Sequence, residues 1–205
     1  MTADESSRTL ICIPIAHSRQ DMGDLGGRLP TDKAYLQRAE AFWVNTQRQV
    51  MALDLAWQGV RVYQDGLPDA ASEIVRRILA EVQSPNYELL RWLVSQGAEV
   101  VGTESLALIK EEYERLRAVL TAKNTRSKAV ARRAYAERAA TLLRERDRYI
   151  AQRIVETLPP EGIGLLFIGE AHCVQAHLPG DVGVRLLRGI PQALKDPPSQ
   201  TPSTD

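Results

Sequence analysis

The sequence has few of the features that mark specialised classes of protein. Its only cysteines, Cys12 and Cys173, are too few for a disulfide framework and lack the CxxC spacing of a metal site. Acidic and basic residues number 26 each, so no overall field favours nucleic acid or an anionic membrane. No apolar run approaches the roughly 18 residues of a membrane span, and the N-terminal segment does not read as a signal peptide. These absences favour a cytoplasmic protein with no membrane partner.

Several motifs of nucleotide-binding proteins and hydrolases are missing as well. The chain has no Walker A sequence, no GxGxxG after a predicted strand, and neither HExxH nor GxSxG. ATP and dinucleotide cofactors are therefore not expected. Nucleic acid is not an expected partner either, because the most basic segment, 123–148, contains few aromatic residues.

Short apolar segments alternate with helical patterns along the chain. Apolar, β-branched character predicts strands at 9–16, 60–64, 98–105 and 162–169, with a candidate fifth at 182–187. Helical periodicity and stop signals predict helices at about 33–57, 70–82, 86–96, 106–121 and 126–157. This alternation predicts an α/β fold, with a mainly parallel sheet of four to five strands covered by helices.

The limits of the domain and of its first strand can also be predicted. We expect one domain over 1–194, with a disordered tail over 195–205 that is rich in proline and polar residues. Pro14 has no N–H for a ladder of hydrogen bonds, so the first strand should lie at an edge of the sheet or end there.

Ionisable side chains follow the four main predicted strands. His17 comes after the first strand, Asp65 after the second and Glu104 near the end of the third. The fourth strand is followed by Glu170 and His172. Ligands bind beyond the carboxyl ends of parallel strands, so we expect these side chains to share one site. Simpler roles compete, since Asp65 begins a common Asp-Gly turn and Glu104 could cap the next helix.

Histidine and carboxylate together suit two kinds of chemistry. They can bind zinc, manganese or iron, for which His17, Glu170 and His172 are the candidate ligands. They can also act as general acid and base on a substrate, either a small molecule or a peptide. The spacing leaves both alternatives open. His177 would not share a helical face with His172, and Cys173 is a weak nucleophile candidate because adjacent side chains point apart.

The long helix predicted over 126–157 is strongly basic. Residues 123–148 contain nine basic and three acidic residues. At about 100° per residue, Arg146 falls within the apolar stripe of the helix, so it must be paired or face a polar pocket. It could orient a carboxylate or bind an anionic group, with an internal salt bridge as the alternative. Four arginines are expected on the solvated face: Arg132, Arg133, Arg144 and Arg148. A homodimer through this helix is an open alternative.

Two strand-terminal segments, PIAH at 14–17 and GEAH at 169–172, resemble the paired GxxH motifs of the TraB superfamily. This broad group includes pheromone-shutdown proteins, Wnt-inactivating metalloproteases, and erythromycin-esterase-like and haem-binding ChaN-like proteins. In those proteins a helix with an arginine precedes the second motif, as ERDRYIAQRIVETL precedes GLLFIGEAH here. Pro14 stands where the first motif has glycine, and the chain is shorter than most members.

The resemblance implies parallel strands with helices, and a hydrolase or a metal- or haem-related role. It points to His17 and His172, with Glu170 inside the second motif and Arg146 as the helix arginine. The sequence therefore predicts a hydrolase, with or without a divalent metal. The predicted site comprises His17, Asp65, Glu104, Arg146, Glu170 and His172. The alternative is a non-catalytic protein that binds a metal, haem or a small metabolite at the same site.

Overall fold

The computed structural model of the chain describes residues 8–15, 26–27 and 33–187. Its strands are β1 (Arg8–Ile15), β2 (Arg61–Gln64), β3 (Glu99–Val101), β4 (Ile163–Gly169) and β5 (Val182–Leu186). Its main helices are α1 (Lys33–Met51), α2 (Ser72–Glu81), α3 (Pro85–Ser95), α4 (Leu106–Thr121) and α5 (Thr125–Thr157). A short 3-10 helix, η2 (Val174–His177), follows β4. His17 and the predicted tail at 195–205 lie outside the described residues.

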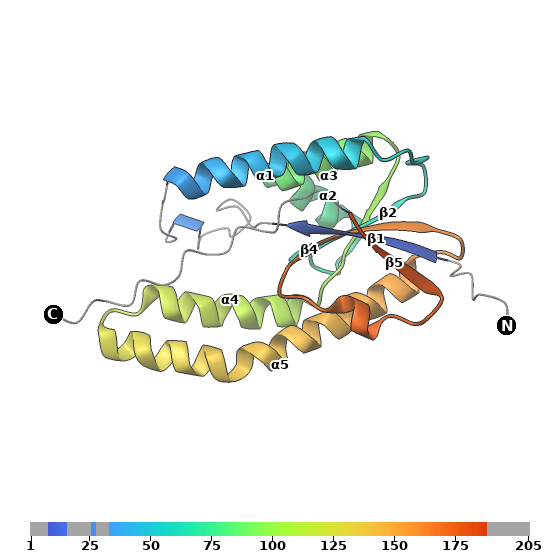
Figure 1. Cartoon of the computed structure of the whole chain (residues 1–205). Helices are drawn as coiled ribbons and strands as arrows, with labels where there is room; N and C mark the ends of the chain where they lie inside the picture. Colours follow the sequence, from blue (N-terminus) through green and yellow to red (C-terminus); the bar gives the residue numbers. More distant parts are fainter. Residues whose placement is uncertain (1–7, 16–25, 28–32, 188–205) are drawn as a thin grey trace.

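The strands form one sheet in the order β3-β2-β4-β1-β5, and every neighbouring pair is parallel. Helices α1, α2 and α3 lie on one face of this sheet, and α4 and α5 lie on the other (Figure 1). The predicted α/β class, with a parallel sheet covered by helices, is confirmed, and the fifth strand is present.

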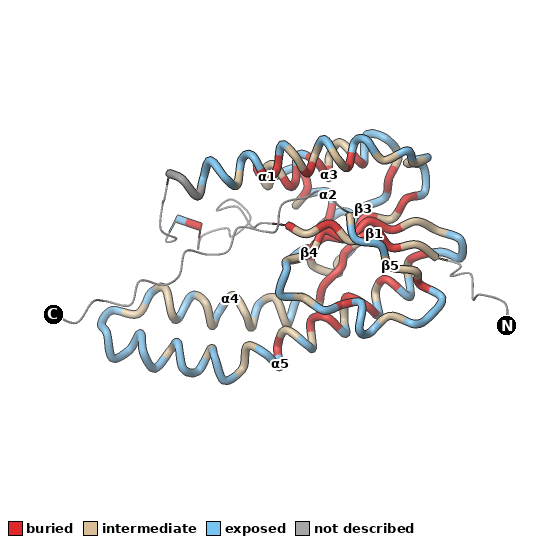
Figure 2. Tube along the Cα trace, viewed as in Figure 1, coloured by how far each residue is buried: buried red, intermediate tan, exposed pale blue. Residues whose placement is uncertain are grey.

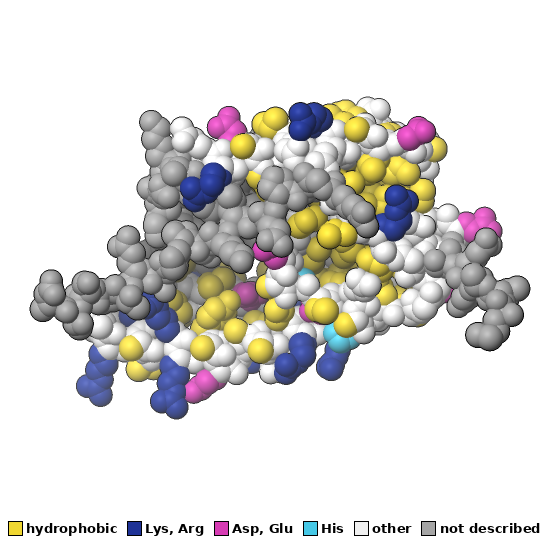
Figure 3. Space-filling model, viewed as in Figure 1, with side chains coloured by type: hydrophobic (Ala, Val, Ile, Leu, Met, Phe, Trp, Pro, Cys, Tyr) yellow, Lys and Arg dark blue, Asp and Glu magenta, His cyan; other side chains and the backbone are white. Residues whose placement is uncertain are grey.

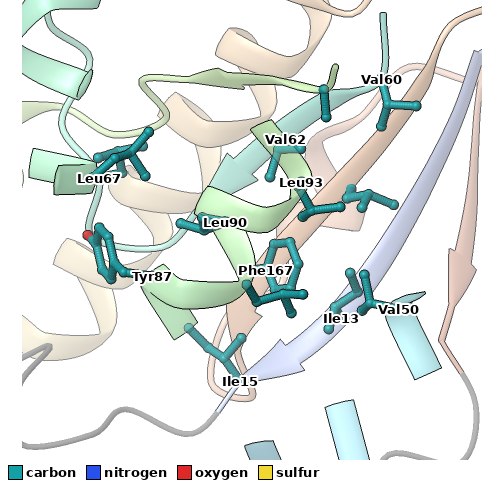
Figure 4. Close-up of a cluster of buried hydrophobic side chains, with 14 of the residues drawn as sticks. Ile13, Ile15, Val50, Val60, Val62, Leu67, Tyr87, Leu90, Leu93 and Phe167 are labelled. Carbon is teal, nitrogen blue, oxygen red and sulfur yellow. The ribbon is translucent and has the colours of Figure 1, made fainter. Parts of the chain in front are cut away.

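Both faces of the sheet are buried because apolar side chains occupy successive strand positions. In β1, Ile13 enters the core beneath α1 and α3, whereas Leu10 enters the core against α5. In β4, Phe167 packs in the core beneath α1 and α3, and Leu166 packs in the core against α5. Figure 4 shows Ile13 and Phe167 beside Leu93 of α3. Full burial of each such side chain stabilises the fold by about 1.5–3 kcal/mol.

Pro14 lies in a central strand rather than at an edge of the sheet, although it does lie near the strand's end. Strand β1 runs between β4 and β5, but the pairing with β5 stops at Cys12. Beside Pro14, only β4 continues the ladder, where Ile168 is the partner in register. Of the two positions predicted for Pro14, the structure therefore shows the strand end.

Two predicted elements are shorter in the structure. The first helix ends at Met51 instead of residue 57, yet Leu53, Leu55 and Trp57 still pack against the core, which explains why their apolar pattern persists. The third strand ends at Val101 instead of residue 105. The residues after it turn away to bond the loop that follows β2.

That loop lies against the end of β3 with little space between the two backbones. A Cβ added to Gly102 would lie 2.6 Å from the Pro68 carbonyl oxygen, so only glycine allows this approach. The amides of Thr103 and Glu104 both donate to the Leu67 carbonyl. These bonds hold the segment after β2 beside the segment after β3.

Helices α4 and α5 form a hairpin that extends beyond the sheet (Figure 1). An Asn124–Ser127 capping box begins α5. All buried residues of α5 lie between Leu142 and Ile154, and α4 has none. Figure 2 shows the same gradient, with buried segments near the sheet and exposed ones toward the free end of the hairpin. None of the described helices combines the length and apolar character that a membrane-crossing helix needs.

Candidate functional site

Three adjacent strands bring ionisable side chains to one edge of the sheet. Asp65 follows β2, Glu104 follows β3 and His172 follows β4, and these strands are neighbours in the order β3-β2-β4. Arg146 reaches the same place from α5, where it contacts both Asp65 and Glu104. The structure thus brings together four of the six predicted site residues.

Arg146 binds carboxylates from three different elements. Its Nε donates to Glu104 Oε2 at 2.6 Å, and its Nη2 donates to Glu104 Oε1 and Asp65 Oδ1, each at 2.8 Å. Its Nη1 donates to Glu112 of α4. Only 8% of Arg146 is exposed and Glu104 is fully buried. The internal salt bridge, which was the alternative for Arg146, is therefore present, and through it Arg146 orients the carboxylates of Asp65 and Glu104.

Backbone amides also donate to the two acids. Gly66 N donates to Glu104 Oε1 at 2.6 Å, and Gly169 N donates to Asp65 Oδ2 at 3.0 Å. Burial raises the pKa of Glu104, and the nearby Asp65 charge raises it further, against the opposing effect of Arg146. Burial alone would lower the pKa of Arg146, but the surrounding carboxylates raise it, so this guanidinium stays charged.

His172 lies between two buried carboxylates at unequal distances. Its Nδ1 is 2.6 Å from Asp147 Oδ1, and because a carboxylate can only accept, Nδ1 carries a proton. Its Nε2 is 3.5 Å from Asp65 Oδ2, which is longer than a normal hydrogen bond. Asp147 is fixed in turn by the backbone N–H of Cys173, which donates to Oδ2 at 2.9 Å.

The surroundings of His172 favour its protonated form. Burial alone would lower its pKa, but the hydrogen bond to Asp147 and the charge of Asp65 outweigh burial and raise the pKa above its ordinary value of 6.5. Four carboxylates (Asp65, Glu104, Glu112 and Asp147) then face two cations, Arg146 and the His172 imidazolium. The cluster is net negative when all its groups are ionised, which helps it to retain protons.

This raised pKa predicts how stability depends on pH. A base whose pKa is higher in the folded state contributes stability below its unfolded pKa and loses it as pH rises through the folded value. We therefore expect the free energy of unfolding to fall as pH rises from 6.5 through the folded pKa of His172. Urea unfolding between pH 6 and pH 9 measures this slope. A His172→Gln variant should show a smaller slope, and an identical slope in both proteins would contradict the assignment.

Asp147 and Glu112 belong to the cluster but were not predicted. Asp147 is 2% exposed and follows Arg146 directly on α5. At 100° per residue it falls about 20° from Ile154, inside the buried stripe, so the helical pattern contained this signal. Glu112 has no such signal, because its position depends on how α4 packs against α5.

A second set of bonds ties α5 to the loop after β2. Tyr149 donates its hydroxyl to Asp69 Oδ2 at 2.9 Å, and Arg153 Nη2 lies 3.0 Å from Asp69 Oδ1. Arg153 Nε also donates to the carbonyl of Gly102. Together with the bond of Arg146 to Asp65, these contacts hold both ends of the loop.

The remaining candidates lie nearer the surface. Glu170 is exposed in the turn after β4, and His177 and Cys173 are also exposed. The arginines predicted to be solvated are exposed on α5, as expected: Arg132, Arg133, Arg144 and Arg148. His17 lies outside the described residues, so the structure does not place it.

The described side chains of the cluster do not by themselves fit a metal ion. Over residues 8–15, 26–27 and 33–187, no three His, Cys, Asp or Glu side chains are grouped to hold one. His172 Nδ1 is engaged by Asp147, and both oxygens of Glu104 are bonded to Arg146. This leaves His172 Nε2 and Asp65 Oδ2 as the facing donors. The predicted ligand set of His17, Glu170 and His172 stays a prediction.

Comparison of the sequence and structure with known proteins gives no match to a protein family, to a curated protein or to a solved structure. The resemblance to the TraB superfamily and the hydrolase function therefore stay predictions.

Proposed function

We propose that this chain is a hydrolase that uses His172 and Asp65 for acid–base catalysis at the carboxyl edge of the sheet. The observation that carries the proposal is the asymmetry of the His172 contacts. Nδ1 is held by Asp147 at 2.6 Å, whereas Nε2 faces Asp65 at 3.5 Å without a tight bond. A histidine held at one nitrogen by a carboxylate, with its other nitrogen facing a second carboxylate at a longer distance, has the arrangement of a catalytic acid or base.

Hydrolysis needs one group to take a proton from water and another to give a proton to the leaving group. The raised pKa of His172 favours the imidazolium, which can donate its Nε2 proton to the leaving group. Asp65 Oδ2 lies beside that nitrogen and can accept a proton from the attacking water. The substrate class is that predicted from sequence, a small molecule or a peptide.

The rest of the cluster supports this pair. Arg146 fixes Asp65 through Oδ1, and Gly169 N donates to Oδ2, so the carboxylate is held in one orientation. Such preorganisation is what acid–base catalysis needs, because the reacting groups must already be aligned when substrate binds. Glu104 holds the other side of Arg146.

The test compares two histidines that are five residues apart. Wild type, His172→Gln and His177→Gln would be assayed on chromogenic carboxylic esters, anilides and phosphate esters. General acid–base catalysis contributes about 10²–10⁴ in rate, so we expect a loss of that size in His172→Gln alone. His177 is exposed and serves as the matched control. Equal turnover in wild type and His172→Gln would refute the catalytic role of His172.

The rival function is a non-catalytic protein that binds a metal, haem or a metabolite. It is tested by elemental mass spectrometry on the native protein beside a His17→Ala/His172→Ala variant. Near-stoichiometric zinc, manganese or iron in the native protein alone would support a metal site. Absorbance on haem titration, with a Soret band lost in His17→Ala, would support the haem alternative.

A further inference from the structure

The hairpin of α4 and α5 carries an excess of positive charge, which an excess of acidic residues in the rest of the chain offsets. Between Leu106 and Arg148 there are twelve basic and six acidic residues. Each of the six acids bonds a partner: Glu111 binds Arg138 and Arg115, Glu145 also binds Arg138, and the others bind Arg146, Lys110, Arg133 and His172. The carboxylates of the hairpin are therefore all paired and do not neutralise its other basic side chains.

Seven basic side chains remain without a salt bridge to any described residue. All seven are exposed: Arg117, Lys123, Arg126, Lys128, Arg132, Arg144 and Arg148. A solvated helix that merely carries charge pairs its opposite signs at three- and four-residue spacings. In this hairpin, unpaired positive charge remains, although the chain as a whole has equal numbers of acidic and basic residues.

Three of these seven side chains, from Arg126, Arg144 and Arg148, lie along one line of α5, together with Arg133, which pairs with Glu137. At 100° per residue, Arg126, Arg133, Arg144 and Arg148 fall within about 60° of one another. The line spans 22 residue steps, or about 33 Å at 1.5 Å per residue. We call these four residues the basic face of α5. In Figure 3, Lys and Arg side chains gather along the lower edge of the molecule, over the hairpin.

The chemistry of the basic face distinguishes among anionic partners. An interfacial membrane helix needs an apolar face. The residues between the arginines on this line are Val130, Glu137 and Thr141, with Ala140 beside it, and they do not form such a face. Binding to single strands relies on aromatic side chains on which bases stack, and this face has none. Exposed arginines on a rigid, projecting helix suit the regular phosphates of a duplex, which guanidinium groups bind in pairs of hydrogen bonds.

We propose that the basic face of α5, with the free end of the hairpin, binds the phosphate backbone of double-stranded nucleic acid. The expectation against nucleic acid rested on the balanced overall charge and on the scarcity of aromatic residues in 123–148. A balanced total does not exclude a local basic patch, and the scarcity of aromatic residues argues only against single strands. This inference does not depend on the hydrolase proposal, because the basic face and the buried cluster are different surfaces of α5.

The test is fluorescence anisotropy of the full chain with a labelled 20-base-pair DNA duplex at two salt concentrations. If four arginines contact phosphates, log K falls with log salt at a slope of about −3.6, which weakens binding about 150-fold between 50 and 200 mM NaCl. In Arg126/Arg144/Arg148→Gln, three contacts are lost and the slope should shrink by about 2.7. Circular dichroism verifies that the variant is folded.

The control removes the same charge from the other side of the sheet. Arg38/Arg76/Arg77→Gln alters exposed arginines of α1 and α2, and this variant should bind the duplex as wild type does. An equal loss in both triple variants would overturn the proposal, because it would show an effect of net charge alone. So would the absence of binding at 50 mM NaCl, tighter binding to the single strand, or binding only to anionic phosphatidylserine vesicles.

Discussion

Replacement of Arg146 by alanine should lower the free energy of unfolding by about 3–5 kcal/mol, the usual effect of removing one partner from a buried ion pair. The substitution leaves Glu104 and Asp65 buried without their cation, at 0% and 5% exposure. It also frees Glu112 and removes one of the links between α5 and the two loops, while the bonds of Tyr149 and Arg153 remain. Urea unfolding at neutral pH measures the effect.

The control is Arg144→Ala, two residues away and exposed on the same helix. This variant should stay within about 0.5 kcal/mol of wild type. The Arg146→Ala deficit should also shrink at acidic pH, because protonated carboxyl groups no longer require a cation. A loss below about 1 kcal/mol at neutral pH would show that the cluster contributes little to the fold.

The second large effect is expected from Asp147→Asn. The asparagine carbonyl can still accept from His172 Nδ1, but its NH2 group cannot accept from the Cys173 N–H, so the variant loses one hydrogen bond together with the negative charge. The hydrogen bond to Asp147 raises the pKa of His172, and a neutral amide supports the imidazolium less than a carboxylate does, so this pKa should fall. We expect hydrolysis to fall about 10²–10⁴-fold, and the pH at which activity is lost on the alkaline side to move to lower values.

The matched control is Asp181→Asn, which removes a half-exposed carboxylate that pairs with Arg8 far along the chain. This variant should hydrolyse at the wild-type rate. If Asp147→Asn kept both its rate and its pH profile, the positioning role of Asp147 would be excluded, and a change in rate without a change in profile would indicate a structural role alone.

The fold could be predicted to a large extent because its signals are local. Short β-branched segments and helical periods gave the order of elements, and a parallel sheet follows from that order. The errors lie where tertiary contacts overrode the pattern. Leu53 and Trp57 continue the apolar spacing of α1 but pack as a non-helical segment, and Glu104 leaves β3 to bond Arg146.

The site was predictable in part for the same reason. Asp65, Glu104 and His172 could be placed at one edge because parallel strands share it, and Arg146 because it interrupts an apolar stripe. Asp147 is detectable from the same stripe, because it falls among the buried positions of α5. Glu112 could not be found from sequence, because no local rule relates its position on α4 to the strand ends.

The measurement that tests the central claim most directly is the titration of His172 by NMR in the folded protein. Its imidazole signals are assigned by comparison with His172→Gln. The account predicts that His172 titrates above 6.5, and that Asp147→Asn moves this pKa down. A His172 pKa below 6.5, or one that does not change in Asp147→Asn, would contradict the claim that two carboxylates stabilise the imidazolium. It would also contradict the proposed role of His172 as the catalytic acid.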